Sequence, residues 1–227
     1  MGTDNLFHKR KAAARDLQRK KPSRHRYDKV LIVCEGSKTE PLYFTDLKDH
    51  YEIDTANIRI SGDCGSAPLT VVNHGEELFR REQRECGEPF DKVYFVFDRD
   101  QHESYLAAIA KIEKLKPSGT FIAIPSTPCF EIWLLLHFKY ISAAFNSNGG
   151  KSSGALVLEE LEKFWPNYKK GSSGAFKYLI DNIEMAKAFA VRLEAESLKN
   201  GSENPLTKVH ELVTYLQKIK VPKTKTL

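Results

Sequence analysis

The chain has 227 residues, of which 41% are hydrophobic and 29% are charged, and its net charge is +5. This composition is typical of a globular protein with one large domain, or with one domain and a small companion. No apolar run approaches the roughly 18–20 residues of a membrane-spanning helix, and the charged N-terminus lacks the apolar segment of a secretory signal, so we expect a cytoplasmic protein without a membrane partner.

Positive charge is concentrated at the start of the chain, in a basic arm formed by residues 1–27. The arm has nine Lys and Arg residues against two Asp residues, a net charge of +7, which leaves −2 for the other 200 residues. Basic arms of this kind often bind nucleic-acid phosphates and release counterions. The candidate phosphate contacts are Lys9, Arg10, Lys11, Arg19, Lys20 and Lys21. A solvated tail without a ligand is the alternative.

After the arm, short apolar strands alternate with helices as far as residue 140. An apolar, β-branched run predicts a buried strand at 29–33, and the following helix at 39–51 has Thr39 as its expected cap. The other expected strands span 58–60, 92–97 and 120–124, the last stopped by Pro125, and the other expected helices span 68–84, 104–115 and 130–138. This alternation predicts an α/β fold in which a parallel sheet has helices on both faces.

The chain beyond residue 145 has a different pattern. The Asn/Ser/Gly-rich stretch 146–154 predicts a loop, and we find no strand of comparable strength after it. Helices are expected at 156–164, 176–196 and 207–216. We therefore predict three parts, which are the basic arm at 1–27, an α/β domain at 28–145, and a helical C-terminal region at 146–227 that packs on it.

The cysteines favour neither a zinc site nor a disulfide framework. The four residues, Cys34, Cys64, Cys86 and Cys129, include no pair in Cys-x-x-Cys spacing. We expect free thiols in a reducing compartment.

Carboxylates follow the first and third predicted strands. Glu35 comes directly after the first run, and the third run, VYFVF, leads into Asp98 and Asp100. Functional residues gather at the carboxyl ends of parallel strands, and residues two apart on an extended chain point the same way. If these strands are neighbours, three carboxylates converge, and Mg²⁺ or Mn²⁺ would offset their repulsion. The alternative is a polar turn in which an aspartate caps the next helix.

Two further charged residues are candidates at the same edge, whereas a third, Arg99, is not. Glu131 opens an almost wholly apolar segment, so it is a candidate metal ligand or general base, with a helix-dipole carboxylate as the alternative. Lys38 is a candidate phosphate contact, with a solvated lysine as the alternative. A P-loop is excluded because Leu31 occupies the position of its first glycine. Arg99 alternates with the two aspartates, so it should point away from them and form a salt bridge.

These residues resemble two related families. A Glu-Gly after one strand and an Asp-x-Asp after another resemble the Toprim domain of topoisomerases, primases and OLD-type nucleases, over residues 28–140. The chain is still more similar to the RloB-like family, also called the AbiLii type. Four stretches carry this resemblance, namely LIVCEGSKTEPLYF (31–44), VYFVFDRD (93–100), PSTPCFEIWLLLHF (125–138) and ENPLTKVHELV (203–213).

The resemblance implies a phage-defence protein with metal-dependent nuclease activity, often encoded beside an ATPase. It implies that Glu35, Asp98 and Asp100 hold Mg²⁺, which activates water and stabilises charge at the phosphorus. No tyrosine is marked out as a nucleophile, so hydrolysis is favoured over strand passage. The substrate is left open between DNA and RNA, including tRNA, and a homodimer is left open as well.

Two alternatives accompany this interpretation. One is a non-catalytic subunit that keeps the Toprim shape and acts through the partner ATPase. The other is a phosphoryl-transfer protein of the receiver or haloacid-dehalogenase kind, which is disfavoured because the first strand offers only Glu35.

Overall fold

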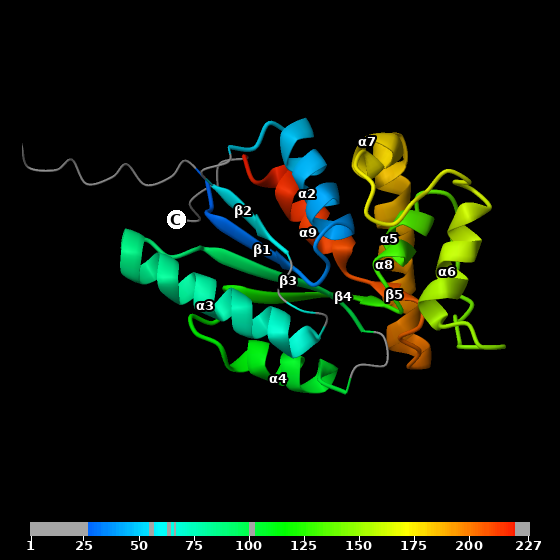
Figure 1. The fold of residues 1–227 in the computed structure, drawn as a ribbon, viewed down its shortest axis with the longest axis horizontal. Helices are drawn as coiled ribbons and strands as arrows, with labels where there is room; N and C mark the ends of the chain where they lie inside the picture. The colour runs from blue at the N-terminus through cyan, green and yellow to red at the C-terminus, as the bar shows by residue number, and fades with distance from the viewer. Residues whose placement is uncertain (1–26, 55–56, 63–64, 66, 100–102, 221–227) are drawn as a thin grey trace, which may run out of the picture.

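The structure, a computed structural model, describes residues 27–54, 57–62, 65, 67–99 and 103–220. Within them, five strands form one sheet with the order β2-β1-β3-β4-β5 (Figure 1). The strands are β1 (Val30–Cys34), β2 (Ile58–Ser61), β3 (Lys92–Asp98), β4 (Phe121–Thr127) and β5 (Leu206–Thr207). Strands β1 to β4 are parallel and β5 is antiparallel to β4, so the predicted parallel sheet is confirmed.

The central strands β1 and β3 are apolar along nearly their whole length because both of their faces are covered. Every residue of β1 is buried, and so are residues 93–97 of β3. Leu31 and Val33 belong to one core cluster, whereas Ile32 and Cys34 belong to the other. Burial on both faces explains why these strands read as continuous apolar runs rather than as alternating patterns.

Two pairs of helices provide this cover (Figure 1). Helices α3 (Pro68–Cys86) and α4 (Tyr105–Lys114) pack on the face that includes Leu31 and Val33. Helices α2 (Thr39–His50) and α9 (Val209–Lys218) cover the opposite face. The predicted arrangement of helices on both faces of the sheet is therefore confirmed.

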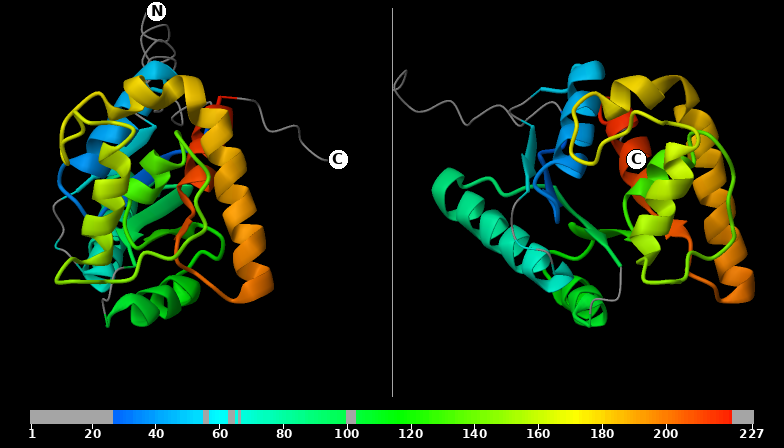
Figure 2. Two further views of the ribbon diagram at one scale, coloured as in Figure 1. Left: turned by 90° about the vertical axis from the view of Figure 1, so that its right-hand side faces the viewer. Right: turned by 45° about the vertical axis from the view of Figure 1, so that its right-hand side comes forward.

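The remaining helices gather beyond the carboxyl ends of the parallel strands (Figures 1 and 2). They are α5 (Glu131–Leu135), α6 (Ser153–Glu162), α7 (Ala175–Leu179), a 3-10 turn (Ile180–Asn182) and α8 (Ile183–Asn200). The predicted helical C-terminal region is thus present, and it adds a strand, β5, to the edge of the sheet. Within the described residues, no helix is long and apolar enough to cross a membrane.

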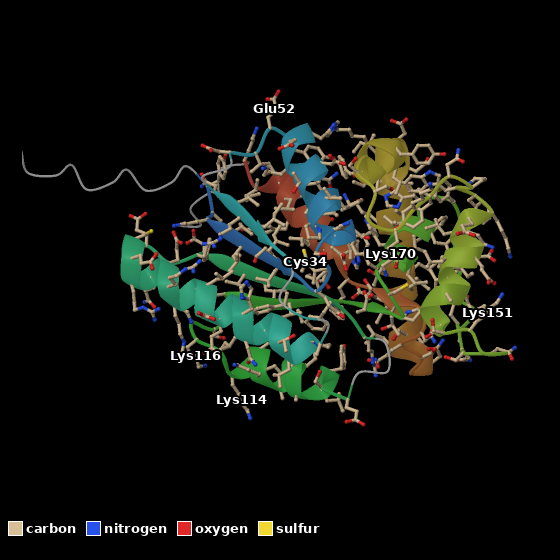
Figure 3. All side chains as sticks on the ribbon, in the orientation of Figure 1. Cys34, Glu52, Lys114, Lys116, Lys151 and Lys170 are labelled. Atoms are coloured by element: carbon tan, nitrogen blue, oxygen red, sulfur yellow. The ribbon has the colours of Figure 1, made fainter. Side chains whose placement is uncertain are left out.

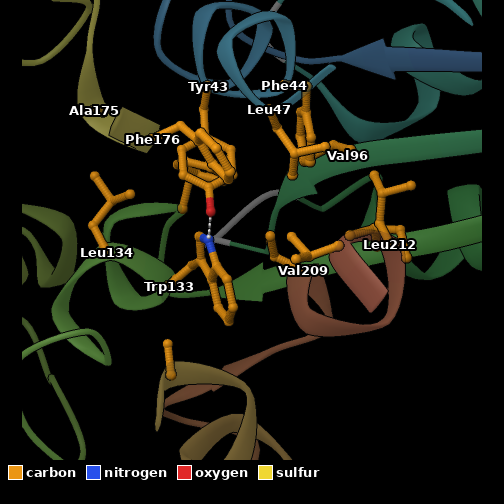
Figure 4. Packing of buried hydrophobic residues seen from close by; sticks show 14 of the residues in the cluster. Tyr43, Phe44, Leu47, Val96, Trp133, Leu134, Ala175, Phe176, Val209 and Leu212 are labelled. Atoms are coloured by element: carbon orange, nitrogen blue, oxygen red, sulfur yellow. Dashed lines mark hydrogen bonds between the residues drawn. The ribbon is translucent and has the colours of Figure 1, made fainter. Parts of the chain in front are cut away.

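A buried aromatic contact joins α2, α5 and α7 (Figure 4). The indole Nε1–H of Trp133 donates to the hydroxyl of Tyr43 at 2.8 Å, and neither side chain is more than 1% exposed. The ring of Phe176 packs edge-on against Tyr43, with centroids 5.4 Å apart. Buried polar groups need such partners, so this bond fixes α5 against α2 at the end of the sheet where the predicted site lies.

The structure corrects three predicted boundaries. The helix expected at 176–196 is divided into α7, the 3-10 turn and α8, and the last helix begins at Val209 because Thr207 belongs to β5. Strand β4 continues through Pro125 to Thr127. The Pro125 carbonyl accepts from the Lys208 backbone, on the side away from β3, so the missing N–H removes no bond to β3.

Candidate active site

Glu35 and Asp98 meet where β1 and β3 end. The two strands are hydrogen-bonded neighbours, as the predicted convergence requires. The backbone N–H of Glu35 donates to the Val96 carbonyl at 2.9 Å, and the backbone N–H of Asp98 donates to Glu35 Oε2 at 3.0 Å. The Glu35 carboxylate is therefore held across the ends of both strands by the backbone itself.

Glu131 reaches the same edge from the start of α5 and is fully buried. Its Oε1 accepts a hydrogen bond from the Tyr168 hydroxyl at 3.3 Å and lies 3.4 Å from Lys170 Nζ. Its Oε2 is buried without a hydrogen-bond partner. A buried carboxylate oxygen without a partner is costly, so this oxygen is suited to accept a ligand that supplies positive charge or a donor.

Glu40 is a fourth carboxylate at this edge, and it is buried in the first turn of α2. Burial raises the pKa of Glu40, and repulsion from Glu131 and Glu35 raises it further. Gly36 leaves space for the Glu40 carboxylate, because a Cβ at residue 36 would lie 2.5 Å from Glu40 Oε2. Only a glycine lets the Glu40 carboxylate lie so close to the backbone that follows Glu35.

Asp98 shares the environment of the other three carboxylates. Burial raises the pKa of Asp98 well above its usual range, and repulsion from Glu40, Glu131 and Glu35 adds to this effect. We refer to Glu35, Glu40, Asp98 and Glu131 as the acidic cluster. Its members come from three strand-to-helix connections, and each raises the electrostatic cost of ionising a neighbour.

The segment between α6 and α7 brings a cation to the acidic cluster. Burial lowers the pKa of Lys170, but the attraction of Glu131, Asp98 and Glu40 is greater in sum and leaves the pKa raised. Lys170 therefore carries its positive charge at neutral pH. In Figure 3 it lies beyond Cys34, the last residue of β1, on the side of the strands' carboxyl ends.

Contacts with α2 hold this segment in place. The Gly171 backbone N–H donates to Thr39 Oγ1 at 2.9 Å, and the Gly174 N–H donates to Asp46 Oδ2 at 2.9 Å. Lys38, not Thr39, is the residue that precedes α2, so the predicted capping role of Thr39 is wrong. Its hydroxyl instead fixes the segment that carries Tyr168 and Lys170.

Of the other residues predicted from the sequence, the structure describes Arg99 and Lys38. Arg99 points away from the cluster as predicted, since its guanidinium pairs with Glu203 and lies 4.8 Å from the Tyr105 ring centre. Lys38 is exposed at the start of α2, beside Gly171. Asp100 and the arm residues lie outside the described part of the chain, and the latter are Lys9, Arg10, Lys11, Arg19, Lys20 and Lys21.

His137 packs in the core near α5. Its Nδ1 contacts the Trp133 carbonyl at 2.9 Å, and its ring lies edge-on against the Trp133 indole. Burial lowers the pKa of His137 to about 4, so the imidazole is neutral at physiological pH. It is a packing residue of the core.

The chemistry of the acidic cluster fits a hard divalent cation. All of its donors are carboxylate oxygens, which Mg²⁺ and Mn²⁺ prefer, and Glu131 Oε2 has no other partner. A cation there would offset the repulsion that raises the pKa of Asp98 and Glu40.

A second group of metal-ligating residues lies at α8 and α9. Among the described residues, Glu194, His210 and Glu211 form the trio whose ligand atoms all lie within 4.8 Å of one another. Lys208 already contacts both glutamates, at 3.4 and 3.1 Å. This lysine supplies the positive charge there, whereas the acidic cluster has four carboxylates facing one nearby lysine.

Sequence reasoning did not identify Glu40, Tyr168 or the role of Lys170. Glu40 could have been found as the first-turn carboxylate of the helix that follows Glu35, because such a helix begins at the same sheet edge. Tyr168 and Lys170 have no comparable signal. They lie in a turn-rich segment more than 30 residues after Glu131, and only tertiary packing brings them to it.

The comparisons with known proteins give one match. The family model for RloB-like proteins matches residues 30–216, which include the acidic cluster, the segment that carries Lys170, and β5. No curated protein and no solved structure matches the chain. Since the family model spans most of the sequence, the chain belongs to the RloB-like family.

Proposed function

We propose that the chain is a metal-dependent nuclease that hydrolyses phosphodiester bonds, with the acidic cluster as its active site. The observation that carries the proposal is the junction of β1 and β3, where the Asp98 backbone donates to the Glu35 carboxylate and where desolvation, with repulsion from Glu40 and Glu131, raises the pKa of Asp98. Membership of the RloB-like family suggests a defence-associated protein, which supports a role against phage.

Glu35, Asp98 and Asp100 would hold Mg²⁺ or Mn²⁺, with Glu131 Oε2 available as a further ligand. When bound, the cation supplies Lewis-acid activation of water and stabilisation of the charge that develops on the phosphoryl oxygens. The remaining roles belong to side chains of this chain and follow from their charges.

Lys170 keeps its positive charge beside the carboxylates, so it would attract a phosphate that the acidic cluster alone repels. Glu40 takes up a proton more readily than an ordinary glutamate, because burial and its acidic neighbours raise its pKa. It is therefore suited to donate a proton to the leaving oxygen. Tyr168 stays protonated, since burial and Glu131 raise its pKa, and its hydroxyl orients Glu131.

The test is cleavage of end-labelled RNA and DNA by the purified chain, with Mg²⁺ or Mn²⁺ and with a chelator. We expect metal-dependent cleavage that falls by at least about 100-fold in Asp98→Asn and Glu35→Gln, a typical loss for a metal ligand or its neighbour. The matched control is Glu113→Gln, an exposed carboxylate on α4, which should cleave at the wild-type rate.

Two outcomes would contradict the proposal. If Asp98→Asn and Glu35→Gln both cleave like the wild type, the activity lies elsewhere. If the pure chain cleaves neither RNA nor DNA, alone or with an ATPase encoded beside it, the result would favour the alternative of a non-catalytic subunit that acts through such a partner.

A further inference from the structure

An aromatic surface lies next to the segment that carries Lys170. It consists of Phe138, which follows α5, Phe164 and Trp165, which follow α6, and Tyr178 of α7, and we refer to these four residues as the aromatic platform. The Trp165 and Tyr178 rings are stacked with centroids 4.4 Å apart and an angle of 18°. The Phe138 and Phe164 rings are stacked with centroids 6.0 Å apart and an angle of 22°. The platform thus presents two pairs of nearly parallel rings.

Half of this platform is exposed to solvent. Tyr178 is 56% exposed and Phe164 is 40% exposed, and they are the aromatic residues among the exposed large hydrophobic side chains of the described chain. A cluster that served only to anchor the segment would bury its rings, as Trp165 does in part. The exposed parts of the Tyr178 and Phe164 rings are open to contact with another planar group.

Lysines lie along the segment that carries most of the platform. Residues 163–178 include four lysines, Lys163, Lys169, Lys170 and Lys177, and no Asp or Glu residue. Lys139 also lies 5.4 Å from the Phe164 ring centre. Lys139 and Lys163 both pair with Glu160, at 2.9 and 2.5 Å, which leaves Lys169, Lys170 and Lys177 as the candidate phosphate contacts of the segment. Exposed rings among lysines are the combination that binds single-stranded nucleic acid, because the bases stack on the rings while the cations contact the phosphates.

The platform is continuous with the acidic cluster. Trp165 packs against Tyr168 with ring centroids 4.9 Å apart, and Tyr168 donates to Glu131 Oε1. The segment from α6 to α7 therefore places the Trp165 ring against Tyr168 and extends Lys170 to Glu131. The same segment extends to Glu131, so a nucleic-acid strand whose bases stack on the platform would have its backbone directed toward the carboxylates.

We infer that the aromatic platform binds the unpaired bases of single-stranded nucleic acid and delivers the adjoining backbone to the acidic cluster. This inference rests on the proposed nuclease function and names its substrate as a single strand or an unpaired loop. A duplex hides the faces of its bases in the stack, so it offers the platform nothing to bind.

The test measures binding without cleavage. Fluorescence anisotropy would follow labelled single strands of RNA and of DNA, about 12 nucleotides long and so within the usual range of site sizes. The titrations would use the full chain with a chelator, and again with Ca²⁺ in place of Mg²⁺. We expect Tyr178→Ala and Phe164→Ala each to weaken binding by about 5- to 100-fold, the loss of one base stack. Tyr178→Phe, which keeps the ring, should bind like the wild type.

Two controls separate stacking from general attraction. Leu198→Ala removes a side chain that is 89% exposed on α8, and it should leave the affinity unchanged. An abasic strand of the same length keeps the phosphates and lacks the bases, so it should bind the wild type more weakly than an ordinary strand binds Tyr178→Ala, which keeps the Phe164 stack. A duplex of the same length should also bind weakly. The RNA and DNA arms show which backbone is preferred.

The inference is overturned if the abasic strand binds like the ordinary one, or if both alanine variants bind like the wild type. Thermal unfolding of each variant shows whether weak binding reflects a damaged fold, and recovery in Tyr178→Phe excludes that explanation. Stacking-dependent binding without cleavage under any condition would overturn the nuclease proposal alone. Cleavage that is equal in the wild type and the alanine variants would overturn the platform alone.

Discussion

At the scale of single residues, the fold brings the carboxylates of the acidic cluster together, and each disfavours the ionised form of its neighbours. Glu40 is buried and Asp98 is partly buried beside two further carboxylates, and desolvation together with repulsion from these neighbours raises the pKa of each. Folding does not require this arrangement, since apolar side chains of similar size would fill the same space at lower cost. Buried carboxylates with perturbed pKa values at the ends of parallel strands are typical of functional sites.

The charge on Asp98 should therefore reduce stability at neutral pH. Its pKa is higher in the folded state than in the unfolded chain, where it is about 3.9. The folded state then binds more protons, so the free energy of unfolding falls as the pH rises from about 4 through the folded-state pKa. Asp98→Asn removes this loss, and we expect it to unfold at a temperature about 2–4 °C above the wild type at pH 7, a gain on the order of 1 kcal/mol.

Calorimetry at pH 4, 5, 6 and 7 without metal would measure this difference. The advantage of Asp98→Asn should shrink as the pH approaches 4, while the exposed control Glu113→Gln should follow the wild type throughout. A lower unfolding temperature for Asp98→Asn at every pH would show that the carboxylate stabilises the fold, contrary to its burial among like charges.

At the scale of the elements, the segment between α6 and α7 completes the site. It is attached to α2 through Gly171 and Gly174 and carries Tyr168 and Lys170 to Glu131. Gly171 has a φ of +78°, and a Cβ there would lie 3.2 Å from the Cβ of Lys38. Both the backbone conformation and the close approach to α2 therefore require glycine.

Gly171→Ala should lower the free energy of unfolding by roughly 1–3 kcal/mol, through the left-handed conformation and the contact with Lys38. Gly150→Ala is the matched control, since Gly150 has a φ of +83° and open space around its Cα. It should lose only about 1 kcal/mol. Denaturant unfolding would measure both losses, and equal losses would show that contact with α2 does not constrain the segment.

The sequence could predict features that are encoded locally, and it could not predict those that depend on tertiary contacts. The apolar runs of β1 and β3 gave their positions to within a residue, because burial on both faces leaves a continuous pattern. Glu35 and Asp98 could be placed at one sheet edge because strand ends define that edge. Strand β5 has two residues, which is too short for any periodicity, and its pairing with β4 is a tertiary contact. Tyr168 and Lys170 were missed for the same reason.

At the scale of the whole molecule, the fold brings separate parts of the chain to one end of the sheet. The α/β part supplies the carboxylates, while the C-terminal region supplies Lys170, Tyr168 and most of the aromatic platform. Both parts contribute to one core cluster, which includes Tyr43, Trp133 and Phe176 (Figure 4). We therefore expect the site to depend on the C-terminal region as much as on the strand ends.

A bound divalent cation should stabilise the whole molecule, because it binds the folded acidic cluster and not the unfolded chain. At a Mn²⁺ concentration about 100 times its Kd, the gain is about 2.7 kcal/mol, or about 5–10 °C in unfolding temperature for a chain of this size. Asp98→Asn should abolish this shift. Glu211→Gln, which alters the trio at α8 and α9, should retain it. A shift that persists in Asp98→Asn and disappears in Glu211→Gln would place the cation at the trio instead.

The position of a bound Mn²⁺ ion tests the central claim most directly. Crystals of the full chain grown with Mn²⁺ would locate the ion by its anomalous scattering, independently of any activity. We predict a peak among Glu35, Asp98 and Asp100, within reach of Glu131, and no peak there in Asp98→Asn. A peak at Glu194, His210 and Glu211 alone, or no peak at saturating Mn²⁺, would contradict the assignment of the acidic cluster as a metal-dependent active site.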